Sequence, residues 1–143
     1  MSVLKIFGFR TLGLLLAVAG NIAAAEVVTV VSPQSPSTTL SRSEVANIFL
    51  GKTRRFPDGN PAVPIDQPEG SVPRDEFYRS VANKRPAEIR AYWAKMIFTG
   101  RGQPPTVVDD DEAVKKILTS RPDGIGYIDR AAVDGRVKVL AVQ

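Results

Sequence analysis

The chain has 143 residues, of which 43% are hydrophobic and 24% are charged, which is the balance of a single globular domain. It contains no cysteine and no histidine, so the sequence excludes disulfides, the usual zinc sites, and catalysis by Cys/His or Ser/His/Asp groups. The net charge of +4 is small, and the only tight basic cluster is Lys52, Arg54 and Arg55, so nucleic-acid binding is not indicated.

The first 25 residues have the pattern of a secretory signal. Lys5 and Arg10 precede an apolar run from Leu12 to Ala19, and the alanines at 23–25 are small residues that a signal peptidase accepts. The run is shorter than the roughly 20 residues of a spanning helix. We therefore expect a cleaved signal peptide at 1–25, a mature periplasmic domain at 26–143, and no stable membrane insertion after cleavage. Cleavage would lower the net charge to +2, because the signal holds two of the 19 Lys and Arg residues and none of the 15 acids.

The mature chain begins with a strand and a strongly capped helix. The β-branched run from Glu26 to Ser32 predicts a strand that is buried on both faces. In the helix that follows, Ser41 and Glu44 have the spacing of a capping box, and Gly51 marks the exit.

The end of this helix also fits a loose nucleotide-binding loop pattern, Ala46-Asn-Ile-Phe-Leu-Gly-Lys-Thr53. Such a loop follows a strand and wraps phosphates with flexible backbone, whereas these apolar residues belong to the last turns of a capped helix. The pattern therefore favours a helix end over an ATPase site.

A short strand from Ala62 to Asp66 leads into the loop Gln67-Pro-Glu-Gly-Ser-Val-Pro-Arg-Asp-Glu-Phe77 and a helix from Pro73 to Ala82. Gly70 and Ser71 offer backbone N–H groups and a hydroxyl beside the positive end of the helix dipole, and Arg74 adds a charge. This combination can bind phosphate or another oxyanion. Because helix N-caps have the same composition, a plain N-cap role for Ser71 is the favoured interpretation.

The next helix, from Pro86 to Phe98, carries apolar residues at three- and four-residue steps, which predicts a face packed on the core. These residues are Ile89, Tyr92, Trp93, Met96 and Ile97. A short strand is expected at Thr106 to Val108.

A further helix is expected from Asp109 to Arg121. The acids at 109–112 could be read as a divalent-metal site, but acids are favoured at a helix start and successive residues diverge around the axis. No metal and no cofactor are predicted.

Two strands, Gly124 to Ile128 and Val137 to Val142, close the chain. Strands that alternate with capped helices predict an α/β sandwich with a central sheet of mixed or mainly parallel strands.

The order of these motifs resembles the phosphate-binding proteins of bacterial ABC uptake systems. The matching features are the helix that ends Ile-Phe-Leu-Gly-Lys52, the Gly-Ser helix start, and Gly124-Ile-Gly-Tyr-Ile128 with the Val-Lys-Val-Leu strand after it. The resemblance runs over the second lobe only and implies a single-lobe periplasmic-binding-protein-like (type II) fold. It implies phosphate or oxyanion binding at Gly70, Ser71 and Arg74, without catalysis.

The sequence departs from that family at the loop itself. The family typically reads Arg-x-x-Gly-Ser-Gly-Thr, whereas Gln67 stands at the arginine position and Val72-Pro73 replaces Gly-Thr. Without the arginine guanidinium a bidentate hydrogen-bonded contact to the anion is lost, and Pro73 has no N–H to donate. We therefore expect weak anion binding or an accessory role. The alternative is a protein-interaction module, docked on an envelope protein, that has lost anion binding.

Overall fold

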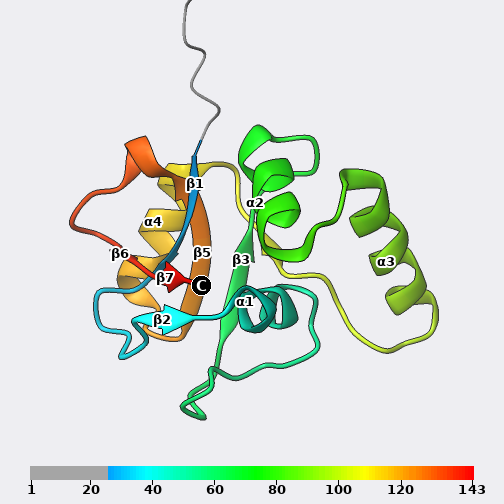
Figure 1. The fold of residues 1–143 in the computed structure, drawn as a ribbon, viewed down its shortest axis with the longest axis horizontal. Helices are drawn as coiled ribbons and strands as arrows, with labels where there is room; N and C mark the ends of the chain where they lie inside the picture. The colour runs from blue at the N-terminus through cyan, green and yellow to red at the C-terminus, as the bar shows by residue number, and fades with distance from the viewer. Residues whose placement is uncertain (1–25) are drawn as a thin grey trace, which may run out of the picture.

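The computed structural model describes residues 26–143, and the predicted signal peptide lies outside the described residues (Figure 1). The strands are β1 (Val27–Val31), β2 (Thr39–Leu40), β3 (Val63–Asp66), β4 (Thr106–Val107), β5 (Gly124–Asp129), β6 (Lys138–Val139) and β7 (Ala141–Val142). The helices are α1 (Arg42–Phe49), α2 (Val72–Ala82), α3 (Pro86–Phe98) and α4 (Asp111–Ser120), with the 3-10 turn η1 (Arg130–Ala132). Among these residues no helix has the length and apolar character needed to cross a bilayer.

The main sheet has five strands in the order β4-β3-β5-β1-β6. Strand β3 is parallel to β4 and β5, whereas β1 is antiparallel to β5 and β6. Strands β2 and β7 form a separate parallel pair. The fold is therefore α/β with a mixed central sheet, as predicted.

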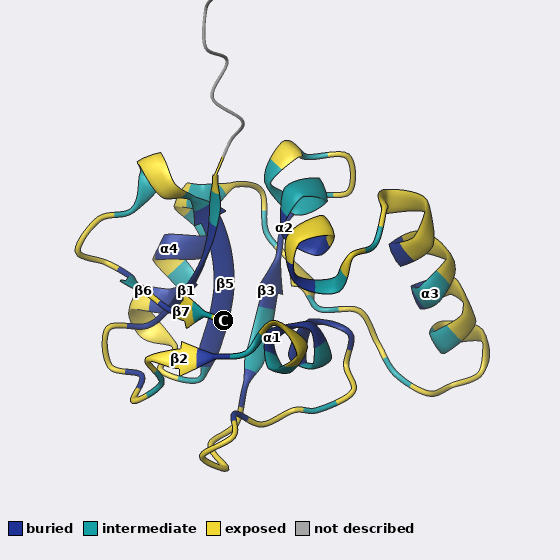
Figure 2. Cartoon of the chain, in the orientation of Figure 1, coloured by how far each residue is buried: buried dark blue, intermediate teal, exposed yellow. Residues whose placement is uncertain are grey.

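Helices cover both faces of the sheet and divide the core in two (Figure 2). On one face, α1 and α2 pack over the sheet and bury Val31 and Ile125. On the other face, Val30 packs with Val114 and Leu118 of α4. Neighbouring β1 residues thus enter opposite halves of the core, which confirms that this strand is buried on both faces.

Three aromatic rings join α1 and α2 to β5. Phe77 stacks on Tyr127 with ring centroids 4.0 Å apart and an interplanar angle of 9°, and Phe49 meets Phe77 edge-on at 4.6 Å. All three side chains are buried. Because this contact holds α2 against β5, it also fixes where α2 begins relative to the end of β3.

The start of α1 confirms the capping box. The Ser41 hydroxyl accepts from Glu44 N–H at 3.1 Å, and Glu44 Oε2 accepts from Ser41 N–H at 2.8 Å. After the helix, Gly51 takes the left-handed conformation at φ +70°, as its predicted place at the helix exit requires. The nucleotide-loop alternative fails because residues 46–49 are helical.

Two sequence predictions are wrong. The single strand expected from Val137 to Val142 is two strands: β6 pairs with β1, β7 pairs with β2, and buried Leu140 stands between them. Its N–H donates to Thr29 O at 2.9 Å as the chain changes sheets. In α3, Ile97 was expected on the packed face but is 57% exposed, because it lies at the edge of that face in the last turn, beyond buried Ile89 and Trp93.

Candidate functional site

The Gly-Ser loop forms a tight turn at the start of α2. Ser71 N–H donates to Pro68 O at 3.1 Å, and Gly70 has φ +85°, a conformation that side chains disfavour. A Cβ added at Gly70 would meet no atom within 4 Å, so the turn and not crowding requires glycine. Ser71 occupies the N-cap position and α2 begins at Val72.

The Ser71 hydroxyl does not cap the helix. Its Oγ is buried, yet it has no hydrogen-bond partner within residues 26–143, in contrast to the Ser41 hydroxyl of α1. The plain N-cap interpretation is therefore right about the position of Ser71 and wrong about its hydrogen bond. Buried hydroxyls normally have a partner, so this one is an unsatisfied donor, and a change of the Ser71 rotamer would present it to a group at the helix start.

Arg74 points inward and not toward the Gly70 turn. Its Nη1 donates to Gln67 O at 3.0 Å and lies 3.3 Å from Asp66 Oδ2. The guanidinium carbon also lies 5.5 Å from the centre of the Tyr78 ring, and 14% of the side chain is exposed. The charge of Arg74 is thus largely compensated inside the protein.

Asp66, which ends β3, is the centre of a buried polar cluster that sequence reasoning missed. Only 1% of its side chain is exposed. Its Oδ2 accepts from the Tyr78 hydroxyl at 2.6 Å, and its Oδ1 accepts from the Tyr127 hydroxyl and from Gln67 N–H. The one available signal was an acid at the end of an apolar strand, and nothing in the sequence pointed to the two tyrosines as its partners.

Both tyrosines are held in the neutral form. Burial, followed by the negative charge of Asp66 and the hydrogen bond to it, raises the pKa of Tyr78 and of Tyr127 far above the ordinary value. Each hydroxyl therefore remains a donor to the carboxylate. The cluster therefore connects β3, α2 and β5 through hydrogen bonds to the Asp66 carboxylate.

Gln67 is buried and faces away from the Gly70 turn. Its Nε2 donates to Asp111 Oδ1 at 2.8 Å and to Tyr127 O at 2.9 Å. Asp111 Oδ2 also accepts from Asp129 N–H at 3.2 Å. Gln67 therefore ties the start of α4 to the sheet, and Asp111 has a packing role at that helix start.

The other acids of this segment confirm a helix start. Asp110 is the N-cap of α4 and accepts from Ala113 N–H at 2.9 Å. Glu112, which is exposed, pairs with buried Lys115 and with Arg136.

The start of α2 is an open surface. Five cavities of the described residues lie elsewhere, and none of the five is lined by Gly70, Ser71 or Arg74. Gly70 is exposed, and so is Val72 at 61%. A ligand here would keep one side in water.

No family model and no curated protein matches this chain, but solved structures do. An ABC-type phosphate transport receptor from Vibrio cholerae is 17% identical with a TM-score of 0.64, over 81% of this chain and 45% of that one. A phosphate ABC transporter substrate-binding protein with bound phosphate from Clostridium perfringens is 22% identical with a TM-score of 0.63, over 81% and 44%. PstS from Borrelia burgdorferi is 17% identical with a TM-score of 0.62, over 82% and 47%.

These likenesses show the fold, and they confirm the predicted resemblance to one part of a periplasmic-binding-protein structure. The chain spans less than half the length of each of these three structures.

Proposed function

We propose that this chain is an exported, non-catalytic, single-lobe domain that binds phosphate or another oxyanion weakly at the start of α2. The observation that carries the proposal is the buried and unpartnered hydroxyl of Ser71 at that helix start. The phosphate named for a solved structure of the same fold supports the choice of ligand class. Export to the periplasm rests on the signal pattern of residues 1–25.

Three features of the turn suit an anion. The Ser71 hydroxyl can donate, the first-turn N–H groups of Val72 and Arg74 have no partner inside the helix, and the dipole of an 11-residue helix adds partial positive charge. Gly70 leaves the approach unobstructed. The N–H missing at Pro73 removes one donor from the turn.

The same geometry limits the affinity. The guanidinium of Arg74 is paired with Asp66, so its charge acts on a bound anion only in part. An anion on an open surface keeps part of its hydration and is screened by salt, and such contacts contribute about 0 to 1 kcal/mol each. Two or three of them correspond to a Kd of about millimolar or weaker.

Calorimetric titration of the protein with phosphate, sulfate and molybdate tests the proposal. We expect heats that fit a Kd of about 1 mM or above and that decrease as ionic strength rises. Submicromolar phosphate binding by a monomer would contradict this site, because its few open contacts do not account for such affinity.

The serines at the two helix starts make a matched pair of variants. Ser71→Ala is expected to leave the free energy of unfolding unchanged or to raise it, since it removes a buried hydroxyl that makes no hydrogen bond. The same variant should weaken phosphate binding several-fold. Ser41→Ala should cost about 1 kcal/mol, because it removes a cap, and should leave phosphate binding unchanged. Urea denaturation and calorimetry measure both properties, and equal phosphate affinity in the two variants would refute the role of Ser71.

The alternative is an interaction module of the cell envelope that no longer binds anions. The observation that favours it is the engagement of Arg74 with Asp66 and the Gln67 carbonyl, which turns this cation inward. The titration separates the two functions, because the alternative predicts no heat with any of the three anions.

A further inference from the structure

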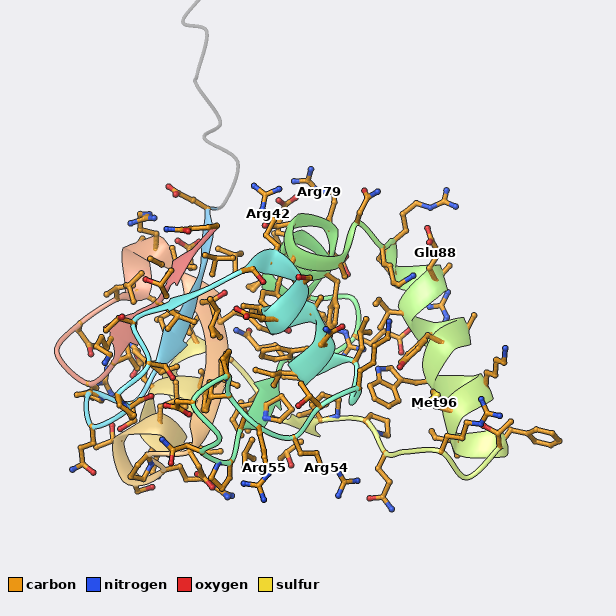
Figure 3. The ribbon with its side chains drawn as sticks, turned by 60° about the horizontal axis from the view of Figure 1, so that its bottom comes forward. Arg42, Arg54, Arg55, Arg79, Glu88 and Met96 are labelled. Atoms are coloured by element: carbon orange, nitrogen blue, oxygen red, sulfur yellow. The ribbon has the colours of Figure 1, made fainter. Side chains whose placement is uncertain are left out.

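Helix α3 lies at one side of the molecule and uses only one of its faces for packing. Figure 1 shows it beyond α2, and Figure 3, where Glu88 and Met96 are labelled on it, shows the same position from another angle. Its inner face buries Ile89 and Trp93 against the body of the protein. Figure 2 shows that most of its remaining surface is exposed.

The outer face of α3 is also apolar. Ala87, Ala91, Ala94 and Phe98 are all exposed and follow one another at steps of four, three and four residues, which places them in one stripe. Phe98 ends the helix and is 91% exposed, and Ile97 beside it is 57% exposed. Two bulky apolar side chains exposed at one helix end are a candidate interaction site.

The charges around this end are all positive. From Ile89 to Val108 the only charged residues are Arg90, Lys95 and Arg101. Arg90 pairs with Glu69 at 2.6 Å, whereas Lys95 and Arg101 form no ion pair within residues 26–143. Phe98 therefore stands between two free cations.

We infer that the outer face of α3, led by Phe98, docks reversibly on a bilayer surface that contains anionic phospholipids. In interfacial helices apolar residues enter the headgroup region while flanking cations meet anionic lipids, and the end of α3 offers Phe98 with Lys95 and Arg101 for these two contacts. Charge complementarity favours an anionic surface as the occupant, because two cations without an ion pair flank Phe98 in sequence and no acid lies between Ile89 and Val108. The position of α3 at the side of the molecule lets Phe98 enter a surface while the domain remains in water. This inference goes beyond anion binding at α2 and does not depend on it.

Each free cation near an anionic surface strengthens binding about 5-fold. We therefore expect binding to vesicles of phosphatidylcholine with 30% phosphatidylglycerol to exceed binding to pure phosphatidylcholine by at least 10-fold, and to fall with salt. The double variant Lys95→Glu, Arg101→Glu should lose that difference.

Flotation with these vesicles tests the role of Phe98. Phe98→Ala should reduce binding at least 3-fold, whereas Val139→Ala, at an apolar residue that is 39% exposed on β6, should not change it. Every variant is purified as the expected mature chain that begins at Glu26, so the apolar run at residues 12–19 does not contribute to the binding. Equal binding by Phe98→Ala and the parent chain would overturn the inference.

A reporter at the same position gives a second, local readout. Phe98→Trp should shift its tryptophan emission to shorter wavelength when anionic vesicles are added, against the constant background of buried Trp93. An unchanged spectrum would show that this end of α3 stays in water.

The oligomeric state in the absence of vesicles is a separate test. If the parent chain is a dimer and Phe98→Ala is a monomer, the inference is overturned, because a second copy would then cover this face.

Discussion

Replacing Asp66 by alanine is expected to lower the free energy of unfolding by about 3 to 5 kcal/mol, as measured by urea denaturation. Two buried tyrosine hydroxyls and the guanidinium of Arg74 would lose their shared acceptor. The loss of this acceptor would weaken the contacts among three elements, because the carboxylate joins β3 to α2 and β5. Tyr78→Phe is the matched smaller change, since it removes one donor to the carboxylate and should cost about 1.5 to 3 kcal/mol.

Asp66→Asn separates the structural role of the cluster from its electrostatic effect on the anion site. The amide keeps the shape of the side chain but removes the charge that compensates Arg74. Phosphate affinity should therefore rise, even as stability falls.

For Asp66→Ala, a loss of less than about 1 kcal/mol in the free energy of unfolding would mean that Asp66 is not the shared acceptor of a buried cluster.

Trp93→Ala is expected to destabilise the domain by about 3 to 5 kcal/mol. Trp93 is 6% exposed, meets Tyr92 edge-on with ring centroids 5.1 Å apart, and lies against Gly51. A cavity there would remove the main apolar contact between α3 and the helix exit of α1. Denaturant titration followed by circular dichroism measures the change.

The control for Trp93 lies on the same helix. Ile97→Ala should change the free energy of unfolding by less than about 0.5 kcal/mol, since this side chain is mostly in water. Comparable losses in the two variants would show that the packed face of α3 has been assigned incorrectly.

Elements with strong local signals were predicted well. The capping box of Ser41 and Glu44 is made by residues three positions apart, so its chemistry is complete within one turn. The bounds of α3 agree because Pro86 marks the first turn and the apolar spacing is helical. Local spacing could not reveal that Ile97 faces water, because that depends on which neighbours cover the helix.

The candidate site was predicted only in part. Gly70 and Ser71 stand at the helix start as expected, because a Gly-Ser turn before a helix is a local feature. The orientation of Arg74 was not predictable, since its partner Asp66 belongs to another element. That acid is itself held by Tyr127, 61 residues away in sequence, so the cluster exists only after β3 and β5 have paired.

The sequence by itself determined the helix starts, the buried strands, the α/β class and the positions of the Gly70 turn and its serine, because propensity, capping and spacing act within a few residues. Tertiary structure alone decided where the charges and free surfaces lie. It turned Arg74 toward Asp66, buried Gln67 against α4, split the last strand between two sheets, and left Phe98 in water. The physical reason is that strand pairing, ion pairing, burial and exposure depend on which distant segments come into contact. The spacing of residues along the chain does not specify those contacts.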